Sequence, residues 1–196
     1  MADQKTINVY DSSVDSYKKM VNKLPDLEPL QAFIDGLPEG ADVLDWGSGP
    51  GYLASRMRDA GLNPVCVDAS AEMVAAARED YGLVARQAQF SALDEVAVYH
   101  GIWANFSLLH ARRDDVPDLI KAASAALLPS GLLYLAVKSG TGEKRDDLGR
   151  LYTYFTQSEL QAVLEQNSFR LIRVFNGRSA GMSGKPEDWF GLLAGK

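Results

Sequence analysis

An aspartate followed by three alternating glycines is the most chemically suggestive pattern in this sequence. A short apolar run ends at Asp45, and Gly47, Gly49 and Gly51 follow it, ahead of a stretch with helical spacing. Glycine lets a backbone turn sharply and lets a ligand approach with no side chain in the way, and the first N–H groups of a helix can bind that ligand. The pattern favours a cofactor-binding loop, with a simple glycine-rich turn as the alternative.

A second acidic residue, Asp68, ends the next apolar run of the chain, residues 65–67. A carboxylate at this point of a βαβ unit can accept both hydroxyl protons of a ribose. A dinucleotide fingerprint would need its third glycine at position 52, where this chain has Tyr52. The charge of Asp45 would also repel a pyrophosphate and attract an ammonium group. The two acids therefore favour a cationic nucleoside cofactor over a nicotinamide dinucleotide.

The strand end and its glycines resemble the first motif of the class I S-adenosylmethionine-dependent methyltransferases, an acidic residue followed by G-x-G-x-G. Later segments are similar to further motifs of this family in the same order, namely 65–70 with Met73, 89–93, 102–110 and 128–132. The sequence departs from the family's usual residues at Ser48, Gln89 and Ser130. The likeness covers residues 40–176 and implies a Rossmann-like fold, with S-adenosylmethionine as cofactor and S-adenosylhomocysteine as product. Residues 150–156, RLYTYFT, resemble small bacterial members that methylate small molecules.

The resemblance also implies a role for each matching residue, and it implies no metal ion. The cofactor-binding set is Asp45, Gly47, Ser48, Gly49 and Gly51 for the methionine ammonium and carboxylate, Asp68 with Ala69 at the ribose-binding strand end, Met73 and Phe90 for the adenine faces, Gln89 for the adenine amine, and Asn105 with Ser107 near the methyl group.

His110 follows the fourth motif and is the candidate catalytic residue. Methyl transfer is an in-line displacement, so the protein mainly has to align the nucleophile and exclude water. A histidine at the cleft edge, with an ordinary pKa of about 6.5, can act as general base for a hydroxyl or amine acceptor. The alternatives are a structural or a substrate-contacting histidine. A carboxylate acceptor held by Arg150 or Lys144 would need no base.

Two further groups of residues have both a functional and a structural interpretation. The basic side chains of residues 138–150 could bind an acidic substrate, although a solvated loop balanced by Asp146 and Asp147 is the favoured alternative. The aromatic residues near positions 10–17 and 152–155 could close the cofactor and acceptor sites, or simply pack in the core. They are Tyr10, Tyr17, Tyr152, Tyr154 and Phe155.

The elements that must position these residues alternate between strands and helices along the chain. Helical spacing covers residues 24–37, 52–60, 71–81 with Ser70 as N-cap, 116–127 and 158–166, and strands are predicted near 43–45, 65–67, 83–85, 102–104, 132–137, 171–175 and 189–193. Such alternation predicts an α/β fold, a Rossmann-like three-layer sandwich with a mostly parallel seven-stranded sheet and helices on both faces. A turn is predicted at 129–131, and no structure is predicted for 139–149.

Composition sets the remaining expectations. The chain has 196 residues, 46% of them hydrophobic, a net charge of −6 and one cysteine. We expect a single methyltransferase domain over 1–196, with an N-terminal helical lid (1–40), a cofactor-binding core (41–138) and an acceptor side (139–196). The acidic charge disfavours nucleic acid as partner. The single cysteine, with no signal peptide pattern and no long apolar run, favours the cytoplasm and no membrane partner. We expect a monomer or a homodimer. A non-catalytic cofactor-binding module with a regulatory role is the alternative to an enzyme that methylates a small-molecule acceptor.

Overall fold

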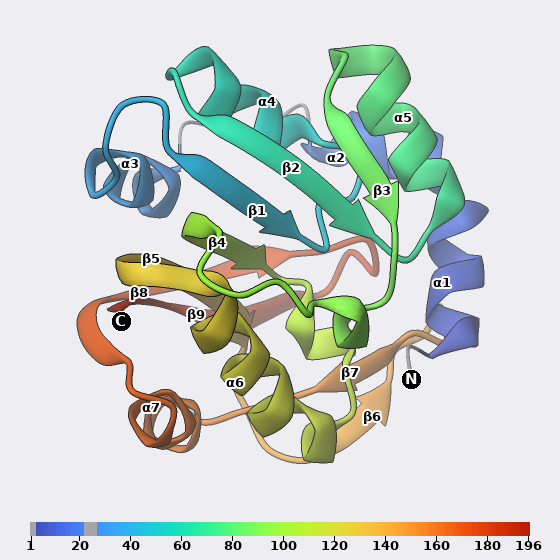
Figure 1. Ribbon diagram of the computed structural model, residues 1–196. Coiled ribbons are helices and arrows are strands. Elements are labelled where there is room, and N and C mark those ends of the chain that lie inside the picture. Colours follow the sequence, from blue (N-terminus) through green and yellow to red (C-terminus); the bar gives the residue numbers. More distant parts are fainter. Residues whose placement is uncertain (1–2, 22–26) are drawn as a thin grey trace.

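A seven-stranded sheet forms the centre of the protein (Figure 1), in a computed structural model that describes residues 3–21 and 27–196. The strand order is β3-β2-β1-β4-β5-β9-β8. Strands β3 to β5 run parallel in this order, and β9 is antiparallel to both β5 and β8. The predicted α/β fold with a mostly parallel seven-stranded sheet is confirmed.

The strands are short where they carry the glycine loop and longer on the other side of the sheet. Their bounds are β1 Asp42–Trp46, β2 Asn63–Asp68, β3 Val84–Gln87, β4 Tyr99–Asn105, β5 Leu127–Lys138, β8 Arg170–Ala180 and β9 Pro186–Gly195. Residues 43–46 of β1 are all buried, because both faces of a parallel sheet are covered by helices.

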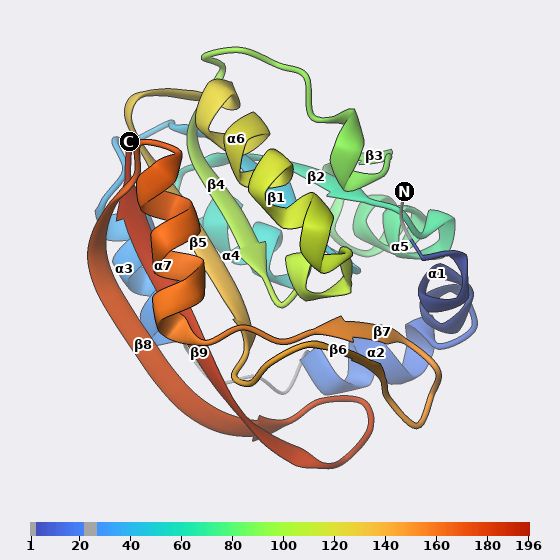
Figure 2. The ribbon, with the colours of Figure 1, turned by 90° about the horizontal axis from the view of Figure 1, so that it is seen from below.

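Helices cover both faces of this sheet. Figure 2 shows α6 and α7 in front of it and α3 and α4 behind it. The bounds are α3 Glu28–Asp35, α4 Tyr52–Asp59 and α5 Ala71–Tyr81 on one side, and α6 Val116–Ala126 and α7 Gln157–Gln166 on the other. Of the predicted first core helix, Leu24 lies outside the described residues. No helix in the described part of the chain is long and apolar enough to cross a membrane.

Side-chain caps define where α5 and α7 begin, and the cap predicted for α5 is confirmed. Ser70 caps α5, since its hydroxyl accepts a hydrogen bond from the Met73 N–H at 3.1 Å. The helix predicted over 158–166 begins one residue earlier, at Gln157, and its N-cap is Thr156. Thr156 accepts from the backbone of Glu159, whose side chain accepts from the Thr156 N–H, and this reciprocal pair satisfies two N–H groups at once.

Two short helices precede the core, α1 Gln4–Asp11 and α2 Val14–Val21. Figure 1 shows α1 beyond the ends toward which β1 and β2 point. The C-terminus of α1 is fixed to α5, because Asp11 accepts a hydrogen bond from the Ser70 hydroxyl at 2.5 Å. Lys18 of α2 forms an ion pair with Asp80 of α5. The two helices therefore form a cover over the carboxyl ends of the strands.

The segment 139–149, for which no structure was predicted, contains a strand. Strand β6, Glu143–Arg145, pairs antiparallel with β7, Leu151–Thr153, through a turn stabilised by Asp146.

The turn predicted at 129–131 does not separate two elements, so this prediction is wrong. The turn lies inside β5 as a bulge, with Ser130 at a φ of 65°, because β4 pairs with Leu127 and then again with Leu132.

Candidate active site

Two cavities lie at the carboxyl ends of the parallel strands and share part of their lining. The larger has a volume of about 460 Å³ and the smaller about 70 Å³. Both are lined by Tyr10 and Tyr17 of the cover and by Gly47, Asn105 and Phe106 of the sheet loops. These five residues mark the junction of the cavities, which is where ligands of parallel α/β sheets bind.

Asp45 lies buried at the end of β1, on the larger cavity, with 3% of its surface exposed. Among the described residues its Oδ2 has no hydrogen-bond partner. Burial, with a smaller effect from the charge of Asp68, raises the pKa of Asp45 to about 8. An unpaired buried carboxylate is costly, and a cation placed against it removes that cost. The carboxyl group therefore fits the ammonium group expected of the cofactor.

Asp68 ends β2 beside the smaller cavity, together with Ala69 and Met73. Its two oxygens accept hydrogen bonds from the N–H groups of Gly49, at 2.8 Å, and Ser70, at 2.9 Å. Burial raises the pKa of Asp68 and these backbone hydrogen bonds oppose the rise. Since each carboxylate oxygen can accept more than one hydrogen bond, the side chain is both held in place and able to receive ribose hydroxyls.

The three glycines of the loop have different reasons to be glycine. All have positive φ, 83° at Gly47, 53° at Gly49 and 83° at Gly51. A Cβ at Gly47 would lie 2.3 Å from the Cβ of Ser107, and a Cβ at Gly49 would lie 3.2 Å from the Tyr17 ring. Gly51 lines neither cavity, and a Cβ there would lie 2.9 Å from the Cβ of Ala77. Gly51 therefore serves the packing of α4 on α5.

Most of the predicted cofactor-binding residues meet at these cavities. Asp45, Gly47, Ser48 and Asn105 line the larger one, and Gly47, Gly49, Asp68, Ala69, Met73, Phe90, Asn105 and Ser107 line the smaller one. Gln89 is exposed and lines neither cavity, so its contact with adenine stays a prediction. The Ser107 hydroxyl donates to the Trp46 carbonyl at 2.6 Å, which ties this loop to the end of β1.

His110 lies under the cover with hydrogen bonds at both ring nitrogens. Its Nδ1 is 2.6 Å from the Leu151 carbonyl oxygen, and its Nε2 is 2.7 Å from the Tyr10 hydroxyl. Because a carbonyl only accepts, Nδ1 carries the proton and Nε2 accepts from Tyr10. Burial, with a smaller effect from Arg150, lowers the pKa of His110 to about 4. For His110 to contact an acceptor directly, as predicted, Tyr10 would have to move. A proton path from the acceptor to His110 by way of the Tyr10 hydroxyl would need no such movement.

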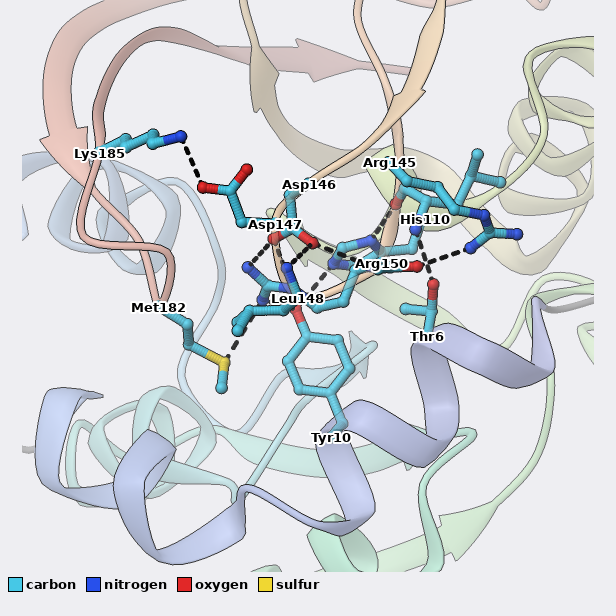
Figure 3. A network of polar contacts seen from close by, with 12 residues as sticks. Thr6, Tyr10, His110, Arg145, Asp146, Asp147, Leu148, Arg150, Met182 and Lys185 are labelled. Carbon is cyan, nitrogen blue, oxygen red and sulfur yellow. Dashed lines mark hydrogen bonds and ion pairs between the residues drawn. The ribbon is translucent and has the colours of Figure 1, made fainter.

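Arg150 is buried, with 2% of its surface exposed, and joins a polar network (Figure 3). Its Nε and Nη2 donate to Asp146 Oδ2 at 3.0 and 2.7 Å. Its Nη1 donates to the Tyr10 hydroxyl at 3.0 Å and to Met182 Sδ at 3.4 Å. The interpretation of this loop as solvated is therefore wrong for Arg150. It holds for Arg145, which is partly exposed and pairs with Asp3 at 2.7 Å.

Part of the aromatic lining of the larger cavity was missed at the sequence level. Tyr10, Tyr17 and Tyr152 were among the candidates, whereas the tryptophans and Tyr134 were not. Trp103 of β4 and Tyr134 of β5 are register partners whose rings stack with centroids 4.0 Å apart. Both line the larger cavity, as do Trp189 of β9 and Tyr152 of β7. The register pairs Asp45 with Trp103, so neighbouring strands place both side chains on one face. Period-two alternation along β4 was the available signal for Trp103. Tyr154 and Phe155, also aromatic candidates, are buried.

No metal site accompanies these cavities in the part of the chain that the structure describes. Residues 3–21 and 27–196 contain no group of three or more histidine, cysteine, aspartate or glutamate side chains arranged to hold a metal ion.

The fold is that of the class I S-adenosylmethionine-dependent methyltransferases. The sequence matches the family described as "Methyltransferase domain" over residues 19–174, and the chain belongs to that family. A search of curated proteins finds no match.

Solved structures show the same fold. An S-adenosylmethionine-dependent methyltransferase from Methanosarcina mazei is 19% identical with a TM-score of 0.74, over 88% of this chain and 99% of that one. The 1,6-didemethyltoxoflavin-N1-methyltransferase of Burkholderia thailandensis is 23% identical with a TM-score of 0.72, over 100% and 91% of the two chains. A TehB-like methyltransferase from Corynebacterium glutamicum is 16% identical with a TM-score of 0.71, over 95% and 97%.

Proposed function

We propose that this protein is an enzyme that transfers a methyl group from S-adenosylmethionine to a small-molecule acceptor. The observation that carries this proposal is the unpartnered, buried Oδ2 of Asp45 at the end of β1. S-adenosylmethionine is the cofactor of the family, and its ammonium group supplies the cation that Asp45 needs. When bound, it supplies an electrophilic methyl group on a sulfonium.

The residues around the smaller cavity would bind the nucleoside part. Asp68 would accept the ribose hydroxyls, while Met73 and Phe90 would pack on the base. Tyr10 and Tyr17 of the cover line this cavity, so the cover lies over the place that the nucleoside would occupy. Movement of the cover formed by α1 and α2 would admit the cofactor, and its return would exclude water from the methyl group.

A proton leaves a hydroxyl or amine acceptor during methylation, and the Tyr10–His110 pair offers a path for it. The Tyr10 oxygen would take the acceptor's proton while the Tyr10 hydroxyl proton passes to Nε2 of His110. Arg150 Nη1 donates to the same oxygen and would stabilise charge that develops on it. His110 would then act as base through Tyr10, at the junction of the two cavities.

The small-molecule acceptor is supported by the size of the larger cavity. Its volume of about 460 Å³ falls in the range of cavities that bind small ligands. The Burkholderia thailandensis relative was solved with 1,6-didemethyltoxoflavin and S-adenosylhomocysteine bound, which makes that protein a small-molecule methyltransferase of the same fold. We place this chain in the same functional class, acting in the cytoplasm without a nucleic acid or membrane partner.

Two measurements test this proposal. In calorimetric titrations, S-adenosylhomocysteine should bind and NAD should not, because the loop lacks the glycine spacing of a pyrophosphate site. With tritiated S-adenosylmethionine and a library of small aromatic and aliphatic nucleophiles, label should appear in an acceptor. Tighter binding of NAD would overturn the cofactor assignment. Cofactor binding without methylation of any compound would favour the alternative, a non-catalytic cofactor-binding module.

A further inference from the structure

The larger cavity has an apolar wall made of aromatic rings from neighbouring strands. Trp103 and Tyr134 stack on β4 and β5 and are buried, and the rings of Phe106 and of Trp189 on β9 form a T-shaped pair with centroids 5.6 Å apart. Gly177 of β8 leaves room for the indole, because a Cβ there would lie 2.4 Å from the Trp189 ring. Aromatic side chains favour ring-shaped ligands through stacked and edge-to-face contacts. The wall therefore suits a planar ring system better than a flexible chain.

The same cavity is also lined by two buried cations, and both lie against the Tyr152 ring. Lys138 Nζ is 4.0 Å and the Arg150 guanidinium carbon 5.1 Å from the ring centroid. Lys138 forms an ion pair with Glu187, whose other oxygen accepts from the Tyr154 hydroxyl at 2.9 Å. The Lys138 charge is therefore already matched by a carboxylate.

Arg150 differs from Lys138 because one nitrogen of its guanidinium faces weak partners. Asp146 accepts from Nε and Nη2, whereas Nη1 donates to the neutral Tyr10 hydroxyl and to the Met182 thioether. A thioether sulfur is a weak acceptor, and hydrogen bonds from a guanidinium to an ionised oxygen are much stronger. In Figure 3 the Met182 side chain extends from the turn after β8 toward Arg150. An anionic oxygen at the position of this sulfur would satisfy Nη1 better.

The acidic side chains of the cavity lining are compatible with an anionic acceptor, because each of them has a cationic partner once the cofactor is bound. The acids that line it are Asp45, Glu28 and Glu187. Glu28 pairs with Arg173 and Glu187 with Lys138, and the cofactor's ammonium would pair with Asp45. An anionic acceptor between the cofactor and Nη1 of Arg150 would therefore meet no unpaired carboxylate of the cavity lining.

From these contacts we infer that the acceptor is a planar aromatic acid. Its ring packs against Trp103, Tyr134 and Trp189, and its carboxylate or ionised phenol oxygen replaces the Met182 sulfur on Nη1 of Arg150. The inference deepens the proposed function and rests on it. Because Arg150 also contacts Tyr10, the anchored acid would lie next to the junction where the methyl group arrives.

The test uses 2-naphthoate as probe, titrated by calorimetry into the protein saturated with S-adenosylhomocysteine. Two compounds control for charge and for planarity, namely 2-naphthamide and cyclohexanecarboxylate. We expect 2-naphthoate to bind at least about tenfold more tightly than either, since a charge-assisted hydrogen bond and the aromatic contacts are each lost in one control. Equal affinities for the acid and its amide would overturn the inference, and this comparison needs no variant.

Two variants locate the effect. Arg150→Met should reduce the preference for the acid over the amide to about twofold or less, whereas Arg145→Gln, in the same turn region but partly exposed and paired with Asp3, should leave it unchanged. An equal loss in both variants would mean a diffuse charge effect and would also overturn the inference. If S-adenosylhomocysteine binds but 2-naphthoate does not, the acceptor class is wrong and the proposed function stands. If S-adenosylhomocysteine itself does not bind, the proposed function fails, and the acceptor role of the cavity fails with it.

Discussion

Replacing Asp45 by asparagine should make the free protein more stable while weakening cofactor binding. Because the pKa of Asp45 is raised from 3.8 to about 8, the folded state holds its proton more tightly than the unfolded state. Stability is therefore lost as the pH rises from about 4 to about 8. Each pKa unit corresponds to about 1.4 kcal/mol, so ionised Asp45 costs at most about 6 kcal/mol. Asparagine keeps the shape of the side chain and removes this cost.

The binding effect has the opposite sign. Removing one partner of a buried charge pair costs about 2 kcal/mol or more, so Asp45→Asn should bind S-adenosylhomocysteine at least about thirtyfold more weakly. Burying the asparagine amide has its own cost, so the net gain in the free energy of unfolding of Asp45→Asn at pH 8 is smaller than the full cost of the charge. A net gain of about 2 kcal/mol would still raise the Tm by about 4 to 8 °C. Thermal unfolding at pH 5 and pH 8 measures the first effect, and calorimetry the second.

Asp42→Asn is the matched control, since Asp42 begins the same strand, is exposed, and loses the same charge. It should change neither the Tm at pH 8 nor the affinity appreciably. The reasoning is refuted if Asp45→Asn lowers stability at pH 8, or if its affinity for S-adenosylhomocysteine equals that of the parent. Either result would mean that the carboxyl group has a partner that serves the fold and not a ligand.

Three further predictions concern the same site. The affinity for S-adenosylhomocysteine should rise between pH 6 and pH 8, because Asp45 must lose its proton to bind an ammonium group. Calorimetric titrations in buffers of different ionisation heat should detect this proton release. An affinity that does not depend on pH would contradict the prediction. Asp68→Ala should reduce the affinity for S-adenosylhomocysteine at least about tenfold, since the charged acceptor of two ribose hydroxyls is lost, and should leave the far-UV circular dichroism spectrum unchanged. Binding as tight as that of the parent would refute the assignment of Asp68 to the ribose. With an acceptor that has a dissociable proton, Tyr10→Phe and His110→Ala should each lower kcat by about 10² to 10⁴ and leave cofactor affinity intact. The double variant should lose no more kcat than either single variant. Additive losses would show that the two residues do not act in one proton path.

The cofactor side of the site was predictable because its signals are local in sequence. An acidic residue, a glycine loop and a helix start follow one another within a few positions, and the backbone conformation of each glycine depends on its neighbours. Asp68 follows the same logic on the adjacent strand. Gly51 shows the limit of this reasoning, because its proximity to Ala77 arises from the packing of two helices and leaves no local trace.

The acceptor side was not predictable because its parts are distant in sequence. Tyr10 and His110 lie 100 positions apart, and the tautomer of His110 depends on a carbonyl of β7. Arg150 was visible as a basic residue beside two acids, a pattern that usually marks a solvated loop. It is buried by contacts with residues distant in sequence, among them Tyr10 and Met182. The capping box of α7 was missed for a smaller reason, since Thr156 and position 158 are both plausible caps by residue type.

The measurement that tests the account most directly is a crystal structure of the protein with S-adenosylhomocysteine. The account predicts the ligand's amino nitrogen within about 3.2 Å of Asp45 Oδ2 and its ribose hydroxyls at similar distances from Asp68. The sulfur should lie at the junction marked by Gly47, Asn105 and Tyr10, facing the larger cavity. A ligand bound elsewhere, or one whose amino group avoids Asp45 and whose sulfur faces away from the larger cavity, would contradict it.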